Sequence, residues 1–422
     1  MTLAENPIVH ETDAEARWLN VIGIGDDGWD GLGTEARNLV EAADLIAGGA
    51  RHIGMVPSVR AETRVWSGDF SSAVRDLEQE RGRLVVVLAS GDPLLYGVGA
   101  LVARTFDRGE VRVLPHISTF AHICARMVWP QLDAEQVSLC GRPVERLRRA
   151  LHDGHNLVVL SADGTTPATV ARYLCAHGFG RSTMHVFEHL GGKDEAHREM
   201  AAADLDDSLH FADLNALAIE CRADDGARAM SVAAGLPDDV FEHDGQITKR
   251  EVRSITLARL EPQPGQLLWD IGLGSGSVSI EWLRFARGMR AIGVERNAGR
   301  AARARRNADS LGVARLTIVE GAATDVISDL KRPDAIFIGG GLTSEGLVPA
   351  CWNALLPGGR LVANTVTLES EAILLEAFRT LGGDLTRIAI ERADPVGTLT
   401  GWRPGMTVIQ WAVTKPRDGD AG

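Results

Sequence analysis

Residues Leu267 to Ser279 read L-L-W-D-I-G-L-G-S-G-S-V-S, and this stretch decides the fold of the second half of the chain. A short apolar run ends at an acid, Asp270, and three glycines follow at alternate positions, Gly272, Gly274 and Gly276. Glycine accepts positive φ and lets a ligand lie against bare backbone. The pattern therefore predicts a buried strand that runs into a tight, ligand-binding turn.

An amphipathic run over residues 277–286 follows the turn and predicts a helix that begins at Ser277 or Ser279. A dinucleotide-binding turn would read G-x-G-x-x-G, with the pyrophosphate on the helix N-terminus. The pattern can start at Gly272 or at Gly274, and the third glycine position is then occupied by Ser277 or Ser279. Neither alignment therefore completes the pattern. A second predicted strand, Arg290 to Glu295, ends in an acid that can accept both ribose hydroxyls of a nucleoside cofactor. The alternative is an ordinary turn with a solvated Glu295.

The G-x-G-x-G order, with Asp270 before it and Glu295 after the next strand, resembles the first motifs of class I S-adenosylmethionine (SAM) methyltransferases. The resemblance implies a Rossmann-like α/β domain with a seven-stranded, mostly parallel sheet. The remaining strands of this sheet are expected over 316–320, 333–341, 360–366, 386–392 and 406–413, helices over 297–311 and 370–381, and a loop over 397–405.

The length of 422 residues predicts two domains. The net charge of −13 disfavours a general nucleic-acid binder, and no apolar run reaches the length of a membrane span. Residues 1–16 are expected to form a loose leader that lacks the features of a signal peptide. Five scattered cysteines without a C-x-x-C pair predict reduced thiols in a cytoplasm and no structural metal.

The first half alternates between strands and helices and is predicted to be an α/β domain in its own right. Strands are expected over 18–25, 83–89, 110–114, 156–161, 184–190 and 214–220, and helices over 35–47, 94–106, 119–127 and 166–177. A stretch poor in periodicity, 223–244, is expected to be the linker between a first domain, 17–222, and a second domain, 245–415.

Four motifs occur in order in the first half: G-I-G-D-D, S-G-D-P-L-L-Y-G, P-H-I-S-T-F and V-F-E-H-L-G-G. Together they resemble the tetrapyrrole methylase family over residues 17–222. The resemblance implies a SAM site in which two loops wrap the cofactor. One loop carries Ser90, Gly91 and Asp92, and the other carries Ser118 and Thr119.

Two residues of these loops have a purely structural alternative. Asp92 precedes a proline, and an Asp-Pro turn that opens a helix needs no ligand. His116 stands where the family usually has glycine, so it either protrudes toward substrate or occupies the turn. We favour the second interpretation, because a lone histidine is more often structural than catalytic.

The second domain opens with G-Q-I-T-K-R-E-V-R, where Thr248 is a plausible N-cap and Glu251 its capping-box partner. This run, with L-W-D-I-G-L-G-S-G-S-V-S-I-E-W and I-F-I-G-G-G, resembles the decarboxylating precorrin methyltransferases of vitamin B12 synthesis. Family cofactor positions carry over to Thr248, Asp270, Gly272, Gly274, Gly276, Glu295 and Ala322. Lys249 and Arg253 are expected to bind carboxylates of the substrate, although a solvated helix face is the alternative.

The two resemblances together imply two methyl transfers, at carbons 5 and 15 of a precorrin-6 type macrocycle, and decarboxylation of the ring-C acetate. They imply one SAM for each domain and a homo-oligomer, a dimer or a tetramer. The acidic charge and the lack of a long apolar run predict no nucleic-acid and no membrane partner. In-line methyl transfer needs no metal and no elaborate catalytic set, so the catalytic residues stay unassigned. His243 is a weak candidate for an acid or base.

Two other functions stay open at this point. A class I RNA or small-molecule methyltransferase with an accessory α/β domain is the first, and the Arg-rich run over 297–311 is its only support. Against it stand the acidic net charge and the absence of an Asn/Asp-Pro-Pro-aromatic motif after Ile338. A non-catalytic carrier with degenerate SAM sites is the second, and the intact glycine turn argues against it for the second half.

Overall fold

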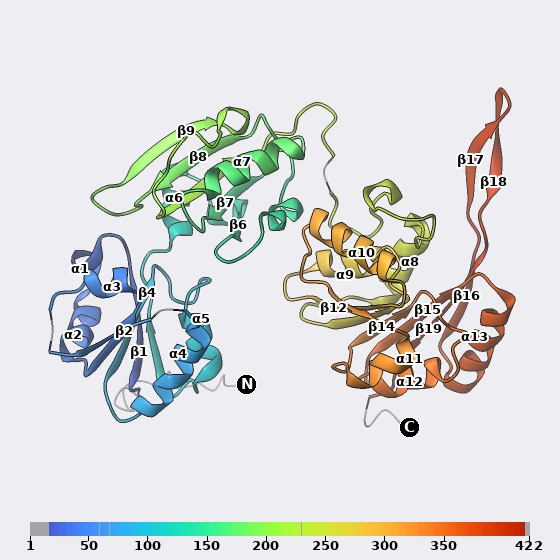
Figure 1. The fold of residues 1–422 in the computed structure, drawn as a ribbon, viewed down its shortest axis with the longest axis horizontal. Coiled ribbons are helices and arrows are strands. Elements are labelled where there is room, and N and C mark those ends of the chain that lie inside the picture. Colours follow the sequence, from blue (N-terminus) through green and yellow to red (C-terminus); the bar gives the residue numbers. More distant parts are fainter. Residues whose placement is uncertain (1–16, 59, 67, 229, 418–422) are drawn as a thin grey trace, which may run out of the picture. The chain divides into compact units, whose positions relative to one another are not determined.

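The computed structural model describes residues 17–58, 60–66, 68–228 and 230–417, so the expected leader lies outside the described chain (Figure 1). The described chain divides into two compact units, which we treat separately. The first runs to Val144 and resumes over His152–Arg228, and the second comprises Glu145–Leu151 and the chain from residue 230 onward. Among the described helices, none is long and apolar enough to cross a membrane.

The first unit begins with a five-stranded parallel sheet in the order β3-β2-β4-β1-β5. Its strands are β1 (Leu19–Ile24), β2 (Leu45–Gly48), β3 (Glu62–Val65), β4 (Val85–Ser90) and β5 (Val111–Leu114). Its helices are α1 (Gly28–Gly31), α2 (Thr34–Ala42), α3 (Ala50–Gly54), α4 (Phe70–Asp76) and α5 (Gly99–Thr105), with the short 3-10 helix η1 (Leu77–Glu80). Parallel pairing brings the carboxyl ends of β1, β4 and β5 to one edge, and this edge carries the candidate site.

Two helices expected in this half are shorter than the sequence pattern suggested. The expected helix over 35–47 ends at Ala42, because Leu45, Ile46 and Ala47 are fully buried in strand β2. The expected helix over 94–106 begins only at Gly99, and the residues after Pro93 form turns. Alanine and leucine in the first place, and two leucines in the second, favour a helix locally, while pairing and turn geometry decide otherwise.

The second part of this unit is a mixed five-stranded sheet in the order β6-β7-β10-β8-β9. Only β6 and β7 are parallel, and the other pairs are antiparallel. The strands are β6 (Ala134–Ser138), β7 (Asn156–Leu160), β8 (Thr183–Glu188), β9 (Ala196–Ala201) and β10 (Asn215–Glu220). The helices are α6 (Thr119–Met127) and α7 (Thr166–Ala176), with short 3-10 helices at η2 (Gln131–Asp133) and η4 (Ala202–Asp204). The 3-10 helix η3 (Val144–Arg149) falls, after its first residue, in the segment that is assigned to the second unit. Strands β6 and β9 are not among the strands that the sequence analysis predicts.

The second unit is built on the expected seven-stranded, mostly parallel sheet, and its strand order is β13-β12-β11-β14-β15-β19-β16. Only β19 runs antiparallel to its neighbours. The strands are β11 (Leu267–Ile271), β12 (Arg290–Glu295), β13 (Thr317–Glu320), β14 (Ala335–Ile338), β15 (Arg360–Thr365), β16 (Asp384–Ile388) and β19 (Val408–Thr414). The helices are α8 (Arg250–Leu260), α9 (Ser277–Phe285), α10 (Ala298–Ser310), α11 (Ala323–Val326), α12 (Leu347–Ala354) and α13 (Leu368–Leu381), with 3-10 helices η5 (Asp238–Val240) and η6 (Ile327–Asp329).

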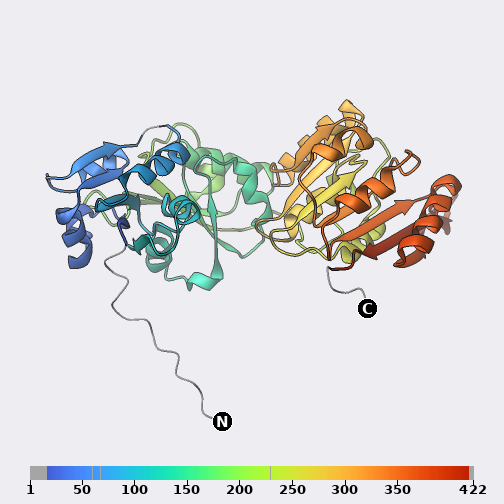
Figure 2. The same cartoon turned by 90° about the horizontal axis from the view of Figure 1, so that it is seen from below.

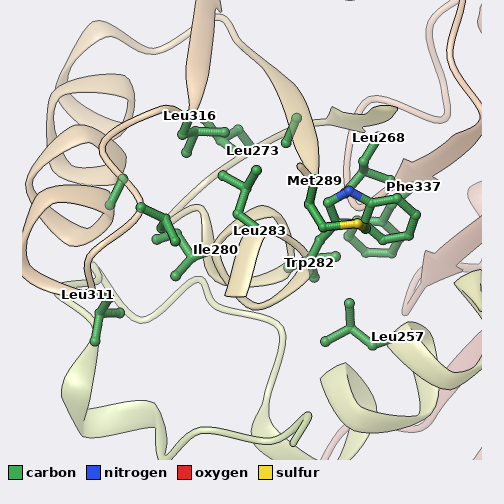
Figure 3. Close-up of a cluster of buried hydrophobic side chains, with 14 of the residues drawn as sticks. Leu257, Leu268, Leu273, Ile280, Trp282, Leu283, Met289, Leu311, Leu316 and Phe337 are labelled. Atoms are coloured by element: carbon green, nitrogen blue, oxygen red, sulfur yellow. The ribbon is translucent and has the colours of Figure 1, made fainter. Parts of the chain in front are cut away.

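Strand β11 feeds the cores on both faces of this sheet. Side chains alternate along a strand, so Leu268 joins the cluster drawn in Figure 3 with Trp282 and Phe337. Trp269 and Ile271 point to the opposite face and join a second cluster. Helices cover both faces (Figures 1 and 2), and both faces of β11 are therefore buried, which explains its continuous apolar run.

A two-stranded hairpin replaces the loop that the sequence suggested over 397–405. Strands β17 (Glu391–Val396) and β18 (Leu399–Pro404) pair only with each other. The hairpin projects from the end of the sheet at β16 and β19 (Figure 1). The expected strand over 386–392 therefore divides, because β16 ends at Ile388 and a separate strand starts at Glu391.

Candidate functional site

The glycine turn of the second unit needs glycine for two physical reasons. Gly272, Gly274 and Gly276 have φ of 76°, 57° and 78°, in the left-handed region. A Cβ on Gly272 would also lie 2.8 Å from the backbone nitrogen of Gly340, just beyond β14. Two strand ends therefore approach more closely here than any side chain would permit.

Glu295 lies at this turn, as its position at the end of β12 predicted. Its Oε2 accepts a hydrogen bond from the backbone N–H of Gly274 at 2.8 Å, and Oε1 accepts one from Asn297 at 2.9 Å. The residue is buried, with 5% of its surface exposed. A carboxylate is thus fixed beside the bare backbone of the turn, the place where a ribose hydroxyl could donate to it.

Asp270 anchors the helix that follows the turn. Its Oδ2 accepts hydrogen bonds from the Ser279 hydroxyl at 2.8 Å and from the Ser279 backbone N–H at 3.2 Å. Burial raises the pKa of Asp270 to about 7, and Glu295 adds to the rise while Ser279 opposes it. The sequence suggested that Ser277 or Ser279 caps the helix, but neither side chain does so. Gly276 occupies the N-cap, and the hydroxyl of Ser279 binds Asp270 instead.

Two further strand ends complete this edge of the sheet. The Gly321 N–H donates to the Glu295 carbonyl at 3.1 Å, and Ala322 occupies the N-cap position of α11. Gly339 donates to the Ile271 carbonyl at 2.9 Å. The carboxyl ends of β11, β12, β13 and β14 therefore meet, and most of the polar groups at their junction are backbone groups.

The start of α8 differs from the expected capping box. Lys249, rather than Thr248, is the N-cap residue, and no side chain caps the helix. Glu251 forms an ion pair with Arg392 of the hairpin instead. Thr248 contributes its carbonyl, which accepts from Arg253 at 2.5 Å.

Arg253 was expected to bind a substrate carboxylate, and the structure corrects this expectation. Its side chain is completely buried and donates to Glu281 Oε1 at 2.6 Å and to Asp238 Oδ1 at 3.1 Å. It also donates to the carbonyls of Thr248 and Leu236 and stacks over the Phe241 ring. A guanidinium enclosed in this way stabilises the start of the domain and is not available to a ligand.

The first unit brings its two expected cofactor loops together at the carboxyl edge of the parallel sheet. Gly91, after β4, donates its N–H to the Ile24 carbonyl of β1 at 3.0 Å, and its carbonyl accepts from His116 N–H at 3.3 Å. Ser118 caps α6 through its hydroxyl, which accepts from the Ala121 N–H at 3.1 Å, and Thr119 is the first helical residue. Backbone hydrogen bonds of Gly91 and the hydroxyl of Ser118 thus hold these loops.

Asp92 and His116 both make the contacts expected of residues with a purely structural role. The Asp92 carboxylate accepts from the Leu94 N–H at 2.9 Å, which is the expected Asp-Pro turn. His116 lies 3.2 Å from the Gly31 carbonyl through Nε2 and 3.5 Å from Asp27 Oδ2, with 11% of its side chain exposed. It therefore occupies the turn, as we favoured.

Sequence reasoning missed a polar cluster on the same edge. His52 Nε2 lies 2.8 Å from the Ser90 hydroxyl, and Arg51 donates to that hydroxyl at 3.3 Å and to Asp26 at 2.9 Å. Burial, with the positive charge of Arg51, lowers the pKa of His52 to about 4. The imidazole is therefore neutral at pH 7. No local pattern marks Arg51 and His52, since they approach Ser90 only through the pairing of β2 with β4.

Both sites are cradles of backbone, glycine and carboxylate groups. Among the described residues, no group of three or more His, Cys, Asp or Glu side chains could hold a metal ion. A close-packed glycine turn and a buried carboxylate at parallel strand ends fit an adenosyl cofactor, which needs shape and ribose recognition more than charge.

Comparison with known proteins matches a different family to each half of the chain. Residues 19–206 match the family described as tetrapyrrole (corrin/porphyrin) methylases, and residues 239–415 match one described as a precorrin methyltransferase domain. A precorrin-6Y C(5,15)-methyltransferase [decarboxylating] of Sinorhizobium sp is 47% identical over 94% of this chain and 96% of its own.

Two further relatives differ in length. A protein of Mycobacterium tuberculosis with the same description is 42% identical over 94% of this chain and 99% of its own. A probable cobalt-precorrin-6B C(15)-methyltransferase (decarboxylating) of Pyrobaculum calidifontis is 37% identical over 39% of this chain and 88% of its own. The shorter relative thus corresponds in size to about one unit of this chain.

Proposed function

The chain belongs to the family of decarboxylating precorrin-6Y C(5,15)-methyltransferases, and on that premise we propose that its two units divide the reactions of the family between them. It is a SAM-dependent methyltransferase that acts on a precorrin. In our proposal the second unit methylates carbon 15 and removes the carboxyl group of the ring-C acetate. The first unit methylates carbon 5.

Two observations support this division. The Pyrobaculum calidifontis relative, described by carbon-15 methylation and decarboxylation alone, has the size of one unit. The motifs that resemble decarboxylating precorrin methyltransferases all lie after residue 244. Carbon 5 is then left to the first unit. We keep 17–222 and 245–415 as the functional domains and 223–244 as the linker between them.

We further propose one SAM for each unit, and the observation that carries it is the pair of separate strand-end cradles. In the first unit the cradle consists of Ser90, Gly91, Asp92, Ser118 and Thr119. In the second it consists of Thr248, Asp270, Gly272, Gly274, Gly276, Glu295 and Ala322. SAM supplies an electrophilic methyl group, and the chain supplies position and exclusion of water. The hydrogen bonds of Glu295 and Asp270 keep the second cradle rigid before the cofactor binds.

Lys249 is our proposed contact for a substrate carboxylate. It follows Thr248, has 44% of its side chain exposed, and lies 3.9 Å from Asp238. A long-range ion pair of this kind leaves the ammonium group free to meet a second carboxylate. Arg253, which is buried, is not part of this proposal.

We propose that the chain binds neither nucleic acid nor a membrane. The arginines of α10 support the first point, because each pairs with a carboxylate of the same unit. The pairs are Arg300 and Arg303 with Asp244, Arg305 with Glu320, and Arg306 with Glu242. Such a neutralised face offers little to a phosphate backbone. All five cysteines, which lie within the described residues, are free, and this supports a cytoplasmic location.

The projecting hairpin supports a homo-oligomer. Strand pairing places Ala393, Pro395 and Trp402 on one face of it, and Trp402 is 72% exposed. The opposite face carries Arg392, Asp394 and Arg403, and also Val396 and Leu399, which are 62% and 76% exposed. A two-stranded hairpin is marginally stable alone, so we propose that a second copy of the chain covers the face that carries Trp402.

The test uses the full-length chain with SAM and a reduced precorrin-6 substrate, followed by product mass. Glu295→Gln removes the ribose-binding carboxylate of the second unit, and Gly91→Val fills the cradle of the first. We expect Glu295→Gln to abolish loss of carbon dioxide and Gly91→Val to retain it. Calorimetry should find two cofactors on the wild-type chain and one on each variant. Decarboxylation that survives Glu295→Gln but not Gly91→Val would contradict the division.

A further inference from the structure

A histidine and a carboxylate join the two sheets of the first unit. His189 follows β8 of the mixed sheet, and Asp26 follows β1 of the parallel sheet. The His189 Nδ1 lies 3.1 Å from Asp26 Oδ2, although the two residues are 163 positions apart in the sequence. The contact lies at the carboxyl edge of the parallel sheet, where the cofactor loops meet.

The backbone around His189 is shaped to make this contact. His189 has φ of 49°, one of four non-glycine residues in the described chain with positive φ. A Cβ on Gly192 would lie 2.4 Å from Asp26 Oδ2, so the H-L-G-G segment comes against the carboxylate only because glycine stands there. Unfavourable backbone of this kind persists where the surrounding structure enforces it, and it is concentrated at functional sites.

The contact also sets the tautomer of the imidazole. An Asp26 carboxylate can only accept, so in the neutral form of the ring Nδ1 carries the proton and Nε2 carries the lone pair. Arg51 donates to the other oxygen of Asp26 at 2.9 Å and holds the carboxylate in place. The His189 side chain remains 36% exposed, so a ligand can reach it.

The same cluster reaches the proposed cofactor loop. Arg51 donates both to Asp26 and to the Ser90 hydroxyl. An unbroken chain of contacts therefore runs from Ser90, where we place the cofactor, through Arg51 and Asp26 to His189. The free Nε2 belongs to a group fixed relative to the site of methyl transfer.

The other histidines near this edge are engaged differently. His116 contacts the Gly31 carbonyl and is mostly buried. His52 is bound to Ser90, and His122 lies 3.3 Å from the Arg126 guanidinium. Among the described histidines of this edge, His189 alone combines a hydrogen bond to a carboxylate with substantial exposure.

Methylation of a meso carbon leaves one proton to be removed. As the new carbon–carbon bond forms, the methyl–sulfur bond breaks and its electron pair stays on sulfur. The methylated carbon then carries both hydrogen and methyl beside an iminium. Breaking its C–H bond returns the electron pair to the conjugated system and releases a proton. Resting on the proposed function, we propose that His189 Nε2 accepts this proton in the first unit, with Asp26 as its positioning residue.

The test compares full-length variants with SAM and the precorrin-6 substrate, followed by product mass and single-turnover rates. His189→Asn removes the base, and asparagine tolerates the left-handed backbone. We expect carbon-5 methylation to fall by about 100-fold or more, with carbon-15 methylation and decarboxylation unchanged. The His189→Asn variant should bind as many molecules of S-adenosylhomocysteine as the wild-type chain does. His197→Asn, on β9 of the same sheet, is the matched control and should keep the wild-type rate.

Rescue distinguishes a base from a structural contact. His189→Gly accepts the same backbone conformation and opens space for free imidazole, which should restore part of the carbon-5 rate in a concentration-dependent way. A His189→Asn variant that methylates carbon 5 at the wild-type rate would overturn the inference. So would a loss that accompanies loss of cofactor binding and that imidazole does not restore. A wild-type chain that transfers no methyl group would instead overturn the proposed function.

Discussion

Replacing Gly272 by alanine tests whether close backbone contact, as well as conformation, shapes the glycine turn of the second unit. Gly272 and Gly274 both have positive φ, 76° and 57°. They differ in the space around them. A Cβ on Gly272 would lie 2.8 Å from Gly340 N and 2.9 Å from Gly340 Cα, whereas a Cβ on Gly274 has its nearest neighbour at 3.8 Å. Gly274→Ala is therefore a matched control.

The two substitutions share one cost and differ in a second. Left-handed backbone costs a non-glycine residue about 1–2 kcal/mol at either position. Only Gly272→Ala also forces one backbone segment away from another, which adds about 1–3 kcal/mol. We expect Gly272→Ala to destabilise the second unit by about 2–5 kcal/mol and Gly274→Ala by about 1–2 kcal/mol.

Differential scanning calorimetry of the full-length chain without cofactor measures this difference. At about 2–4 °C per kcal/mol, Gly272→Ala should lower the unfolding temperature of the second unit roughly 2–12 °C further than Gly274→Ala does. The transition of the first unit should not move, and it serves as an internal reference. Equal shifts for the two variants, or a larger shift for Gly274→Ala, would refute the steric argument.

Three further changes have defined outcomes. Burial raises the pKa of Asp270 from 3.8 to about 7, so the folded state holds a proton that the unfolded state releases, and this contribution to stability falls as pH rises from about 4 to about 7. Asp270→Asn should therefore match wild type near pH 4 and exceed it by up to about 4 kcal/mol above pH 7 in urea unfolding. If the variant and wild type had equal free energies of unfolding at both pH values, the Asp270 carboxylate would not be desolvated. Arg253→Met leaves Glu281 buried without its guanidinium and should cost about 3–5 kcal/mol, whereas Lys249→Met should hardly change the unfolding temperature. Similar losses for the two would contradict the burial of Arg253. Trp402→Ser should lower the molar mass in light scattering without changing the unfolding of the monomer, and an unchanged mass would remove the hairpin from the interface.

Much of the second unit could be predicted because its signals are local. The apolar run before Asp270, the alternating glycines and the acid at Glu295 each lie within a few residues of the element that they mark. Alternation and glycine spacing are enforced by backbone geometry that any chain must obey. The seven-stranded sheet itself was implied by the family resemblance, and the structure confirms it.

The errors occur where distant residues decide. Residues 45–47 read as the end of a helix, and they form a strand because β3 and β4 pair with them on both sides. Arg253 was predicted to bind a ligand because it is a basic residue near the expected cofactor position Thr248. Its burial depends on Glu281, 28 residues away, and no spacing rule connects the two.

The sequence by itself determined the order of the motifs and the positions of the two turns at which we propose that a cofactor binds, because φ preferences and apolar periodicity act over short range. Only the tertiary structure decided which charged groups face solvent and which face each other. The contact between Asp26 and His189 and the enclosure of Arg253 both arise when chain segments meet across the fold. Desolvation and hydrogen bonding then set the role of each group, and both depend on neighbours that the sequence does not place.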